Sequence, residues 1–272
     1  MDHLPSLRPV AVAFFIVWTL FGATVYYAVA RFLLKGGGKV DTLAFRNADL
    51  WVAVGFVTWF ALLILGSFDA PQHDVTEPNI LCNAGLYVGI VAALGIFMQW
   101  RGINPLRQFG LTRLNPFTCM ALAVGFMIAT HPITLITEFT TFILMHGQTQ
   151  PQNVIEYFLH AAQRSDSRAV ALMLVVAVVI APLAEETIFR GYLYGVFKRY
   201  LGGIGAGLLT AGLFAAMHLN LAALPSLFVL ALCLTLAYEA TGSLLVNIFM
   251  HGLFNLSSLL AIMYFTKHSP AP

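Results

Sequence analysis

Three charged residues interrupt a long apolar stretch in the second half of the chain. Glu185, Glu186 and Arg190 directly follow an uninterrupted apolar run over residues 170–183. A charged side chain at the centre of a bilayer costs about 2.5–3.5 kcal/mol on insertion scales, so such residues are retained where they have a partner or a chemical task. Glu186 and Arg190 are four residues apart, share one face of a helix and can form an ion pair. We interpret this pair as a structural support.

Glu185 lies about 100° around the helix from Glu186 and therefore needs other partners. Candidates follow it in the sequence: His218, and the pair His251 and Asn255, whose spacing of four places both on one helical face. A single histidine in an apolar helix is usually a satisfied core residue. Two histidines on separate helices, together with a helix that carries two carboxylates, favour a functional site.

Such a cluster suits the activation of water. A glutamate and a histidine can hold and deprotonate a water molecule, and a histidine–asparagine pair can donate hydrogen bonds to the oxyanion that forms when the water attacks a carbonyl. The same side chains could bind zinc, with Glu185, His218 and His251 as candidate ligands. The sequence has no HExxH motif, no serine nucleophile motif and no aspartate inside an expected span. These absences exclude the site-2-type metalloproteases, the rhomboid type and the presenilin type.

The composition places the whole chain in a membrane. Of its 272 residues, 59% are hydrophobic and 10% are charged, and the mean hydropathy is +0.82. We therefore expect an all-α, polytopic membrane protein, with the lipid bilayer as a partner and no nucleic acid. A spanning helix needs about 20 apolar residues. The expected spans are residues 10–33, 50–68, 79–100, 117–145, 169–197, 205–222, 224–240 and 243–266.

The basic residues predict the orientation of these spans. Nine lysines and arginines fall in the first, third and fifth loops, and four fall on the other side. The positive-inside rule then places these three loops in the cytoplasm and both termini outside, with the first segment retained. Residues 151–167 predict a short amphipathic helix in the outer interface. The rise along each helix puts Glu185 and His218 both roughly 18–20 Å from the cytoplasmic ends of their helices, in the middle or cytoplasmic half of the bilayer.

Three short motifs, in order along residues 169–260, resemble those of the CPBP family, which comprises CAAX proteases and bacteriocin-processing enzymes and is also called the Abi family. The motifs are EExxxR at Glu185–Arg190, FxxxH at Phe214–His218 and HxxxN at His251–Asn255. Each motif alone is weak, but three in order on separate helices are fairly specific. The family would divide the chain into N-terminal helices with the amphipathic helix, residues 1–168, and a catalytic helical core, residues 169–266, within one integrated membrane domain.

The resemblance implies an intramembrane endopeptidase of about eight helices around an active-site cavity. By position, Glu185 and His218 would activate the water, and His251 and Asn255 would stabilise the oxyanion, with the neighbouring ion pair in support. Members are described both as metalloproteases that use Zn²⁺ and as metal-free, glutamate-dependent enzymes, and both remain open. The implied substrate is a peptide or protein that is prenylated or embedded in the membrane, in CAAX-type or in peptide and bacteriocin processing, at a prokaryotic plasma membrane.

A non-catalytic function is the alternative. The chain could be an immunity factor or scaffold, or a transporter that carries protons through its buried glutamates and histidines. A transporter would be expected to show repeat symmetry and paired broken helices, and the sequence shows neither. The simultaneous presence of Glu185, His218, His251 and Asn255 favours the enzyme.

Overall fold

The computed structural model describes residues 9–68, 75–148 and 153–268, and every regular element within them is helical, as expected for an all-α protein. The elements are α1 (Pro9–Leu34), α2 (Asn47–Ser67), α3 (Glu77–Trp100), α4 (Pro105–Gln108), α5 (Pro116–Leu144), α6 (Asn153–Gln163), α7 (Ser167–Val175), η1 (Val176–Ile180), α8 (Ala181–Glu185), η2 (Glu186–Tyr194), α9 (Gly195–Ala216), α10 (Leu224–Thr241) and α11 (Leu244–His268). The segments η1 and η2 are π-helical and continue the helix of α7 and α8.

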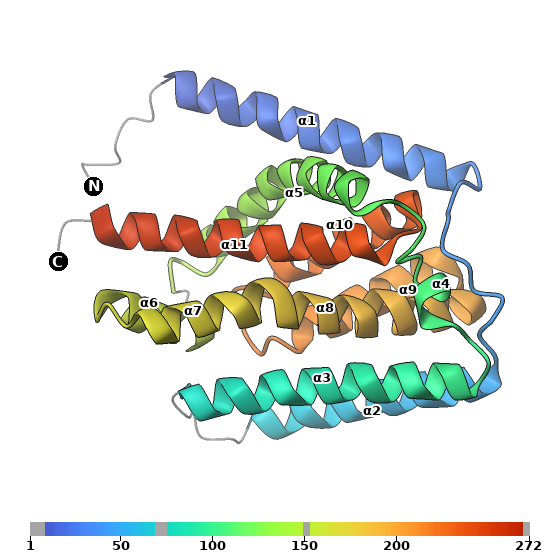
Figure 1. Cartoon of the computed structure of the whole chain (residues 1–272). Helices are drawn as coiled ribbons and strands as arrows, with labels where there is room; N and C mark the ends of the chain where they lie inside the picture. Colours follow the sequence, from blue (N-terminus) through green and yellow to red (C-terminus); the bar gives the residue numbers. More distant parts are fainter. Residues whose placement is uncertain (1–8, 69–74, 149–152, 269–272) are drawn as a thin grey trace.

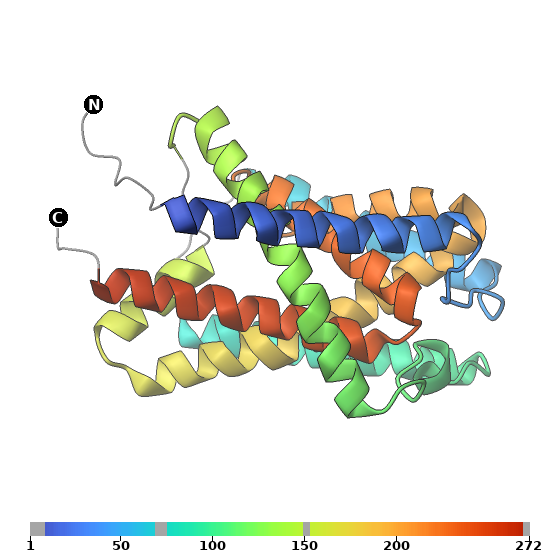
Figure 2. The same ribbon diagram turned by 90° about the horizontal axis from the view of Figure 1, so that it is seen from above.

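The helices form a bundle whose centre is α8, η2, α10 and α11. The pair α2 and α3 lies on one side of this centre and α1 lies on the other (Figure 1). Helix α5 crosses obliquely between α1 and α11 (Figure 2) and packs against α1, α10 and α11. The elements that carry the three motifs therefore lie inside the bundle, and the first three helices flank them.

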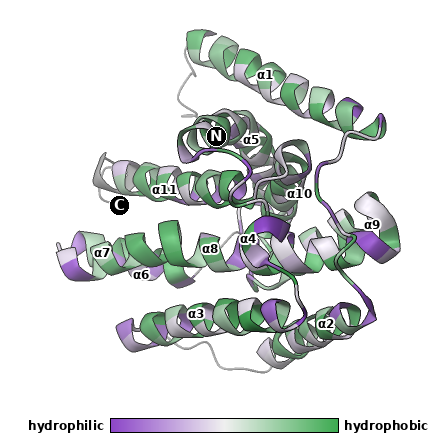
Figure 3. Cartoon of the chain, turned by 45° about the vertical axis from the view of Figure 1, so that its right-hand side comes forward, coloured by the Kyte–Doolittle hydropathy of each residue, from purple (hydrophilic) through white to green (hydrophobic). Residues whose placement is uncertain are grey.

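The outer walls of the bundle are apolar. Large side chains such as Phe14, Leu62 and Ile96 are 67%, 63% and 70% exposed. Hydrophilic residues gather at the helix ends and around α4, whereas the helix walls are hydrophobic (Figure 3). Among the described residues, seven helices are long and apolar enough to cross a membrane. The chain is an integral membrane protein.

One of these helices accounts for two of the expected spans. It runs over Ser167–Ala216, 50 residues, which would be about 75 Å if straight, against a hydrocarbon core of about 30 Å. Gly202 breaks it with a φ of 71° and a ψ of 171°. The chain folds back there, because Phe214 after the break contacts Phe189 before it, with ring centroids 5.3 Å apart. The expected spans 169–197 and 205–222 are thus the two arms of a helical hairpin.

The second arm is shorter than the sequence predicts. The helix ends at Ala216, so the expectation of a span to residue 222 is wrong. Leu219 has a positive φ of 51°, and the side chain of Asn220 accepts a hydrogen bond from the backbone N–H of Ala223. Such a local acceptor offers the backbone an alternative to the helix. His218, expected inside a helix, therefore lies in the turn that follows one.

Residues 203–216 are about 21 Å long as a helix and cannot cross the bilayer alone. Glu185 lies 17 residues before the Gly202 break and His218 lies 16 residues after it. The turn at His218 is therefore at the depth of Glu185. Irregular backbone at membrane depth is tolerated where it is buried in protein or lines a water-filled cavity.

The three basic loops meet at one end of the bundle. The ammonium of Lys198, in the fifth loop, donates to the carbonyl of Val40 in the first loop over 3.0 Å. Gln108, in the third loop, donates to the carbonyl of Asp41 over 2.7 Å. The predicted grouping of loops one, three and five on one side is confirmed, and that side is the right-hand end in Figure 1.

Helix α6 confirms the helix expected between the fourth and fifth spans, although Gln152 lies outside the described residues. Phe158 and Ala161 are buried, whereas Glu156 and His160 are exposed. The helix is therefore amphipathic, and its position in the outer interface stays a prediction.

Proline 132 lies inside α5 and removes one backbone donor from the helix. In a regular helix its missing N–H would bond to the carbonyl of Ile128. That carbonyl instead accepts a hydrogen bond of 2.7 Å from the indole N–H of Trp18 in α1. A backbone group left unpaired in hydrocarbon costs several kcal/mol, so this contact anchors α1 to the kinked α5.

Gly252 sets the distance between α11 and η1. A Cβ atom at this position would lie 2.4 Å from the carbonyl oxygen of Val178. We expect Gly252→Ala to push the two helices apart and to lower the stability by about 1–3 kcal/mol, as overpacking does. Thermal unfolding of the purified protein in detergent measures this loss.

Gly125 in α5 provides the matched control, because a Cβ there would meet no atom within 4 Å. Gly125→Ala should be neutral or should stabilise the helix by about 0.5–1 kcal/mol. Equal unfolding temperatures for the two variants would contradict the close approach of α11 to η1.

Candidate active site

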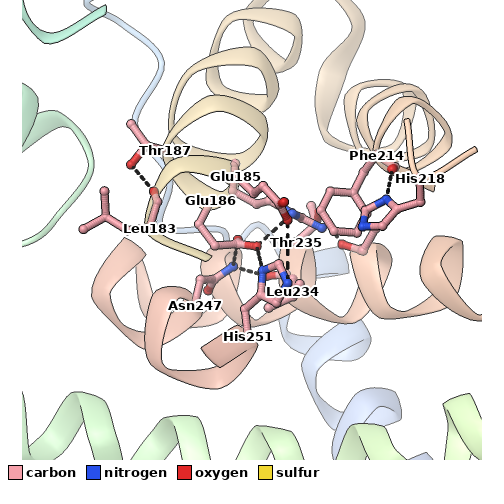
Figure 4. A network of polar contacts seen from close by, with 12 residues as sticks. Leu183, Glu185, Glu186, Thr187, Phe214, His218, Leu234, Thr235, Asn247 and His251 are labelled. Carbon is pink, nitrogen blue, oxygen red and sulfur yellow. Dashed lines mark hydrogen bonds and ion pairs between the residues drawn. The ribbon is translucent and has the colours of Figure 1, made fainter. Parts of the chain in front are cut away.

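The carboxylate of Glu186 is the centre of the polar network in the bundle. It is 0% exposed, and three side chains donate to it. Its Oε1 lies 2.8 Å from Nη1 of Arg190 and 2.9 Å from Nδ1 of His251. Its Oε2 accepts from the amide of Asn247 over 3.2 Å (Figure 4). The predicted ion pair between Glu186 and Arg190 is confirmed, and it is completed by two residues of α11.

The hydrogen bond to Glu186 fixes the state of the His251 ring. A nitrogen that faces a carboxylate oxygen at hydrogen-bond distance carries the hydrogen, so Nδ1 of His251 is the donor. The other nitrogen, Nε2, faces Oε2 of Glu185 at 3.8 Å. This distance is too long for a direct hydrogen bond. It leaves a gap between a ring nitrogen and a carboxylate oxygen that one water molecule could bridge.

Glu185 is held from its other side by Tyr87. The phenol of Tyr87, in α3, donates to Oε1 of Glu185 over 3.0 Å. The side chain of Glu185 is 13% exposed, whereas that of Glu186 is 0% exposed. The two adjacent glutamates therefore have different environments: Glu186 is closed in by donors, and Glu185 has one oxygen bound and one facing the gap.

His218 joins this group through an aromatic ring. Its Nδ1 lies 2.8 Å from the carbonyl of Phe214, so Nδ1 is again the donor and Nε2 carries the lone pair. The ring of Phe214 contacts both histidine rings, with centroids 4.8 Å from His218 and 5.8 Å from His251. The guanidinium of Arg190 lies 4.4 Å from the centroid of the same ring, a cation–π contact. The ring of Phe214 thereby links His218 to His251 and to Arg190.

Asn255 has a different partner from the one that the sequence suggests. The N–H of Ala181, at the start of α8, bonds to the carbonyl of Val176 in η1, five residues back. The next bond in this pattern would join residue 182 to Ala177, but residue 182 is proline and has no N–H. The amide of Asn255 donates to the carbonyl of Ala177 instead, over 2.9 Å. Asn255 thus replaces a missing backbone hydrogen bond.

An asparagine amide has two hydrogens. One of them is used in the bond from Asn255 to Ala177. Only the second hydrogen could therefore donate to an oxyanion. In the described part of the chain, Asn255 makes no hydrogen bond to Glu185 or Glu186. Of the residues predicted from the sequence, the structure brings together Glu185, Glu186 and His251 with their arginine, places His218 beside them, and leaves Asn255 one turn further along α11.

Two residues of the network were missed by the sequence analysis. Asn247 lies four residues before His251, so a search for polar residues on the same helical face could have found it. Tyr87 lies 98 residues from Glu185, and nothing in its local sequence marks it except a hydroxyl in an apolar helix. From its place at the end of the expected span 224–240, near the inner surface, Glu239 would be expected to be solvated, but it is buried and pairs with Lys198 and Tyr194.

The arrangement does not fit a metal site. A zinc ion in a catalytic site takes three protein ligands at about 2.0–2.3 Å. Within the described residues, no group of three or more histidine, cysteine, aspartate or glutamate side chains is placed to hold a metal ion. Of the candidate ligands, Oε2 of Glu185 and Nε2 of His251 lie 3.8 Å apart, and the ring of Phe214 contacts the rings of both histidines.

The two glutamates should respond differently to the loss of charge. Glu186→Gln leaves the buried Arg190 without its counter-ion, and breaking a buried ion pair costs about 3–5 kcal/mol. Glu185→Gln removes no ion pair within hydrogen-bond distance, so it should change stability by less than about 1 kcal/mol. Denaturant unfolding of both variants in detergent measures the difference. Equal losses would show that Glu186 is not the electrostatic centre.

Near Pro182, the side chain of Asn255 replaces a backbone hydrogen bond to Ala177, and a double mutant can test this replacement. Asn255→Leu leaves the carbonyl of Ala177 unpaired and should lower stability by about 1–3 kcal/mol. Pro182→Ala supplies a backbone N–H to the same helix. In the Pro182→Ala background the cost of Asn255→Leu should therefore fall by at least half. Unchanged costs in the two backgrounds would contradict this role of Asn255.

Comparisons with known proteins bear on the same helices. Residues 167–257 match the family described as type II CAAX prenyl endopeptidase Rce1-like. An uncharacterized 24.3 kDa protein of Escherichia coli is 39% identical over 87 residues, which are 30% of this chain and 40% of that protein. The "Putative membrane peptidase YdiL" of Bacillus subtilis (strain 168) is 27% identical over 212 residues, 75% of this chain and 83% of that protein.

No solved structure matches the chain. The family match begins where α7 begins and ends two residues after Asn255, so it covers all three motifs and the Glu186 network. The motifs, the family match over residues 167–257 and the relative named "Putative membrane peptidase YdiL" together support an intramembrane protease of the CPBP type.

Proposed function

We propose that this protein is an intramembrane endopeptidase that hydrolyses a peptide bond with a water molecule bound beside Glu185. The observation that carries the proposal is the 3.8 Å separation between Oε2 of Glu185 and Nε2 of His251. Each of these groups is fixed from behind, Glu185 by Tyr87 and His251 by Glu186. Two fixed polar groups at this separation can bind and orient one water at membrane depth, which is what hydrolysis requires.

The chemistry proceeds in two steps. Glu185 accepts a proton from the water while the water oxygen forms a bond to the carbonyl carbon of the substrate. His218, whose Nε2 carries a lone pair, orients the water with a second hydrogen bond. The C–N bond then breaks, and Glu185 passes the proton to the departing nitrogen. The products are a carboxylic acid and an amine, which exchange a proton to give a carboxylate and an ammonium group.

The oxyanion of the intermediate needs donors. Nε2 of His251 can donate to the oxyanion when it carries a hydrogen, while Nδ1 of the same ring keeps its bond of 2.9 Å to Glu186. The second amide hydrogen of Asn255 is the other candidate. In this mechanism Glu185, His218, His251 and Asn255 act on water or substrate, and Glu186 and Arg190 hold the site together.

The expected depth of the site and the similarity to the matched family support one substrate class. We propose a peptide or protein that reaches the bilayer interior because it is prenylated or because it is itself a membrane segment. The matched family is described as type II CAAX prenyl endopeptidase Rce1-like, and a relative from Bacillus subtilis is named "Putative membrane peptidase YdiL". CAAX-type processing and processing of a membrane peptide are therefore the two substrates to compare.

The test is cleavage of defined peptides by the purified full-length protein in lipid vesicles. Glu185→Ala and His218→Ala should each lower kcat by about 10²-fold or more, because each removes a group that acts on the water. Glu156→Ala and His160→Ala, exposed residues of α6, are the matched controls and should keep wild-type activity. Equal activity in all five proteins would refute the mechanism.

Two further arms of this experiment test whether the substrate must be prenylated and whether the reaction needs a metal ion. A farnesylated peptide ending in a CAAX sequence and the same peptide without the lipid show whether prenylation is recognised. A chelator, followed by added Zn²⁺, tests the metal. Activity lost and then restored would mean that substrate binding assembles Glu185, His218 and His251 around a zinc ion. Unchanged activity is expected from their separated positions in this structure.

A further inference from the structure

Helix α3 contributes one hydroxyl to the site from outside the family match. Ala84, Leu94 and Met98 are buried on the face of α3 that turns toward the bundle, and Tyr87 lies on this face at helical spacing. Its neighbours Leu86 and Val88 are 51% and 59% exposed on the outer side. Helix α3 packs against α8 and η1. Tyr87 is therefore directed at the end of α8, where Glu185 lies.

The contact of Tyr87 restricts what Glu185 can do. A carboxylate has two equivalent oxygens and rotates about its last side-chain bond. The hydroxyl of Tyr87 donates to Oε1 over 3.0 Å, a hydrogen bond to a charged acceptor and therefore among the stronger kinds. With Oε1 engaged, Oε2 is the oxygen that faces Nε2 of His251 across 3.8 Å.

We propose that Tyr87 is a positioning residue that orients the carboxylate of Glu185 to accept a proton from the water. The inference rests on the proposed function for its catalytic consequence, but the contact itself does not. Without the hydroxyl, the carboxylate of Glu185 is free to turn toward His251 and close the gap in which the water binds. The N-terminal helices would then have a defined part in the reaction, because α3 supplies the group that sets the reactive oxygen.

The first measurement is the steady-state kinetics of Tyr87→Phe with the membrane peptide. Phenylalanine keeps the ring and removes only the hydroxyl. We expect kcat to fall about 10-fold to 100-fold, as a misplaced catalytic group does, while KM stays within about twofold, because Tyr87 acts through Glu185 and does not contact the substrate.

Tyr26→Phe is the matched control. Tyr26 is buried and its hydroxyl lies 2.6 Å from the hydroxyl of Thr130, in the contact between α1 and α5. It loses a buried hydrogen bond of the same kind away from Glu185, so its kcat should stay within about twofold of wild type. An equal loss of kcat in both variants would mean that the effect of Tyr87 is general to the bundle, and this would overturn the inference.

The second measurement needs no substrate. A double-mutant cycle on thermal unfolding compares Tyr87→Phe in wild type and in Glu185→Ala. We expect Tyr87→Phe to lower the Tm by about 2–4 °C in wild type and by less than about 1 °C without Glu185. Additive shifts would show that the two side chains do not interact and would overturn the inference, whether or not the protein cleaves peptides.

The outcomes separate the two proposals. Wild-type protein that cleaves nothing refutes the peptidase, while the cycle still decides the contact. Active wild type with an unchanged kcat in Tyr87→Phe refutes the positioning role alone. A raised KM with unchanged kcat also refutes it, because Tyr87 would then bind substrate.

Discussion

The negative charge of Glu186 has no access to water, and the centre of the bundle is arranged around it. An ion removed from water is stable in a protein when its lone pairs are filled by donors and its charge is paired. Arg190 supplies the charge from the same helix, and His251 and Asn247 supply donors from α11. Because these donors come from two helices, the requirement of one carboxylate fixes the distance and rotation of η2 relative to α11. The same bond fixes the hydrogen on the ring of His251 and thereby decides which nitrogen faces Glu185.

The hydrocarbon interior imposes a second condition, on the backbone. Each of the two internal prolines leaves a carbonyl without a donor, and in both cases a side chain from another helix replaces it. Trp18 of α1 bonds to Ile128 in α5, and Asn255 of α11 bonds to Ala177 in η1. These contacts join α1 to α5 and α11 to η1. The prolines therefore contribute to the packing of the bundle as well as to the shape of individual helices.

The features of the fold that depend on local residue spacing could be predicted from the sequence. The long apolar runs gave the spans, and the spacing of four between Glu186 and Arg190 predicted their pairing. The equal depth of Glu185 and His218 followed from the rise per residue. Contacts between distant segments could not be predicted, because they depend on how helices rotate against one another: Tyr87 reaches Glu185 across 98 residues and Asn255 reaches Ala177 across 78. The early end of α9 was missed because residues 217–222 are apolar enough to continue a helix. In the structure, the side chain of Asn220 accepts a backbone hydrogen bond there and a turn forms instead.

The late pairing of the Ala177 carbonyl also affects how the protein is inserted into the membrane and folded. A chain that enters the membrane from its N-terminus delivers this carbonyl before Asn255 has been synthesised, 78 residues later. During that interval the helix around Pro182 lacks one of its hydrogen bonds, and Glu186 has Arg190 but neither His251 nor Asn247. The half-made bundle thus contains a weakened, polar segment that either retains water or remains near the insertion machinery. Only the arrival of α11 completes the backbone and the ion pair, so the last helix is the one that closes the fold.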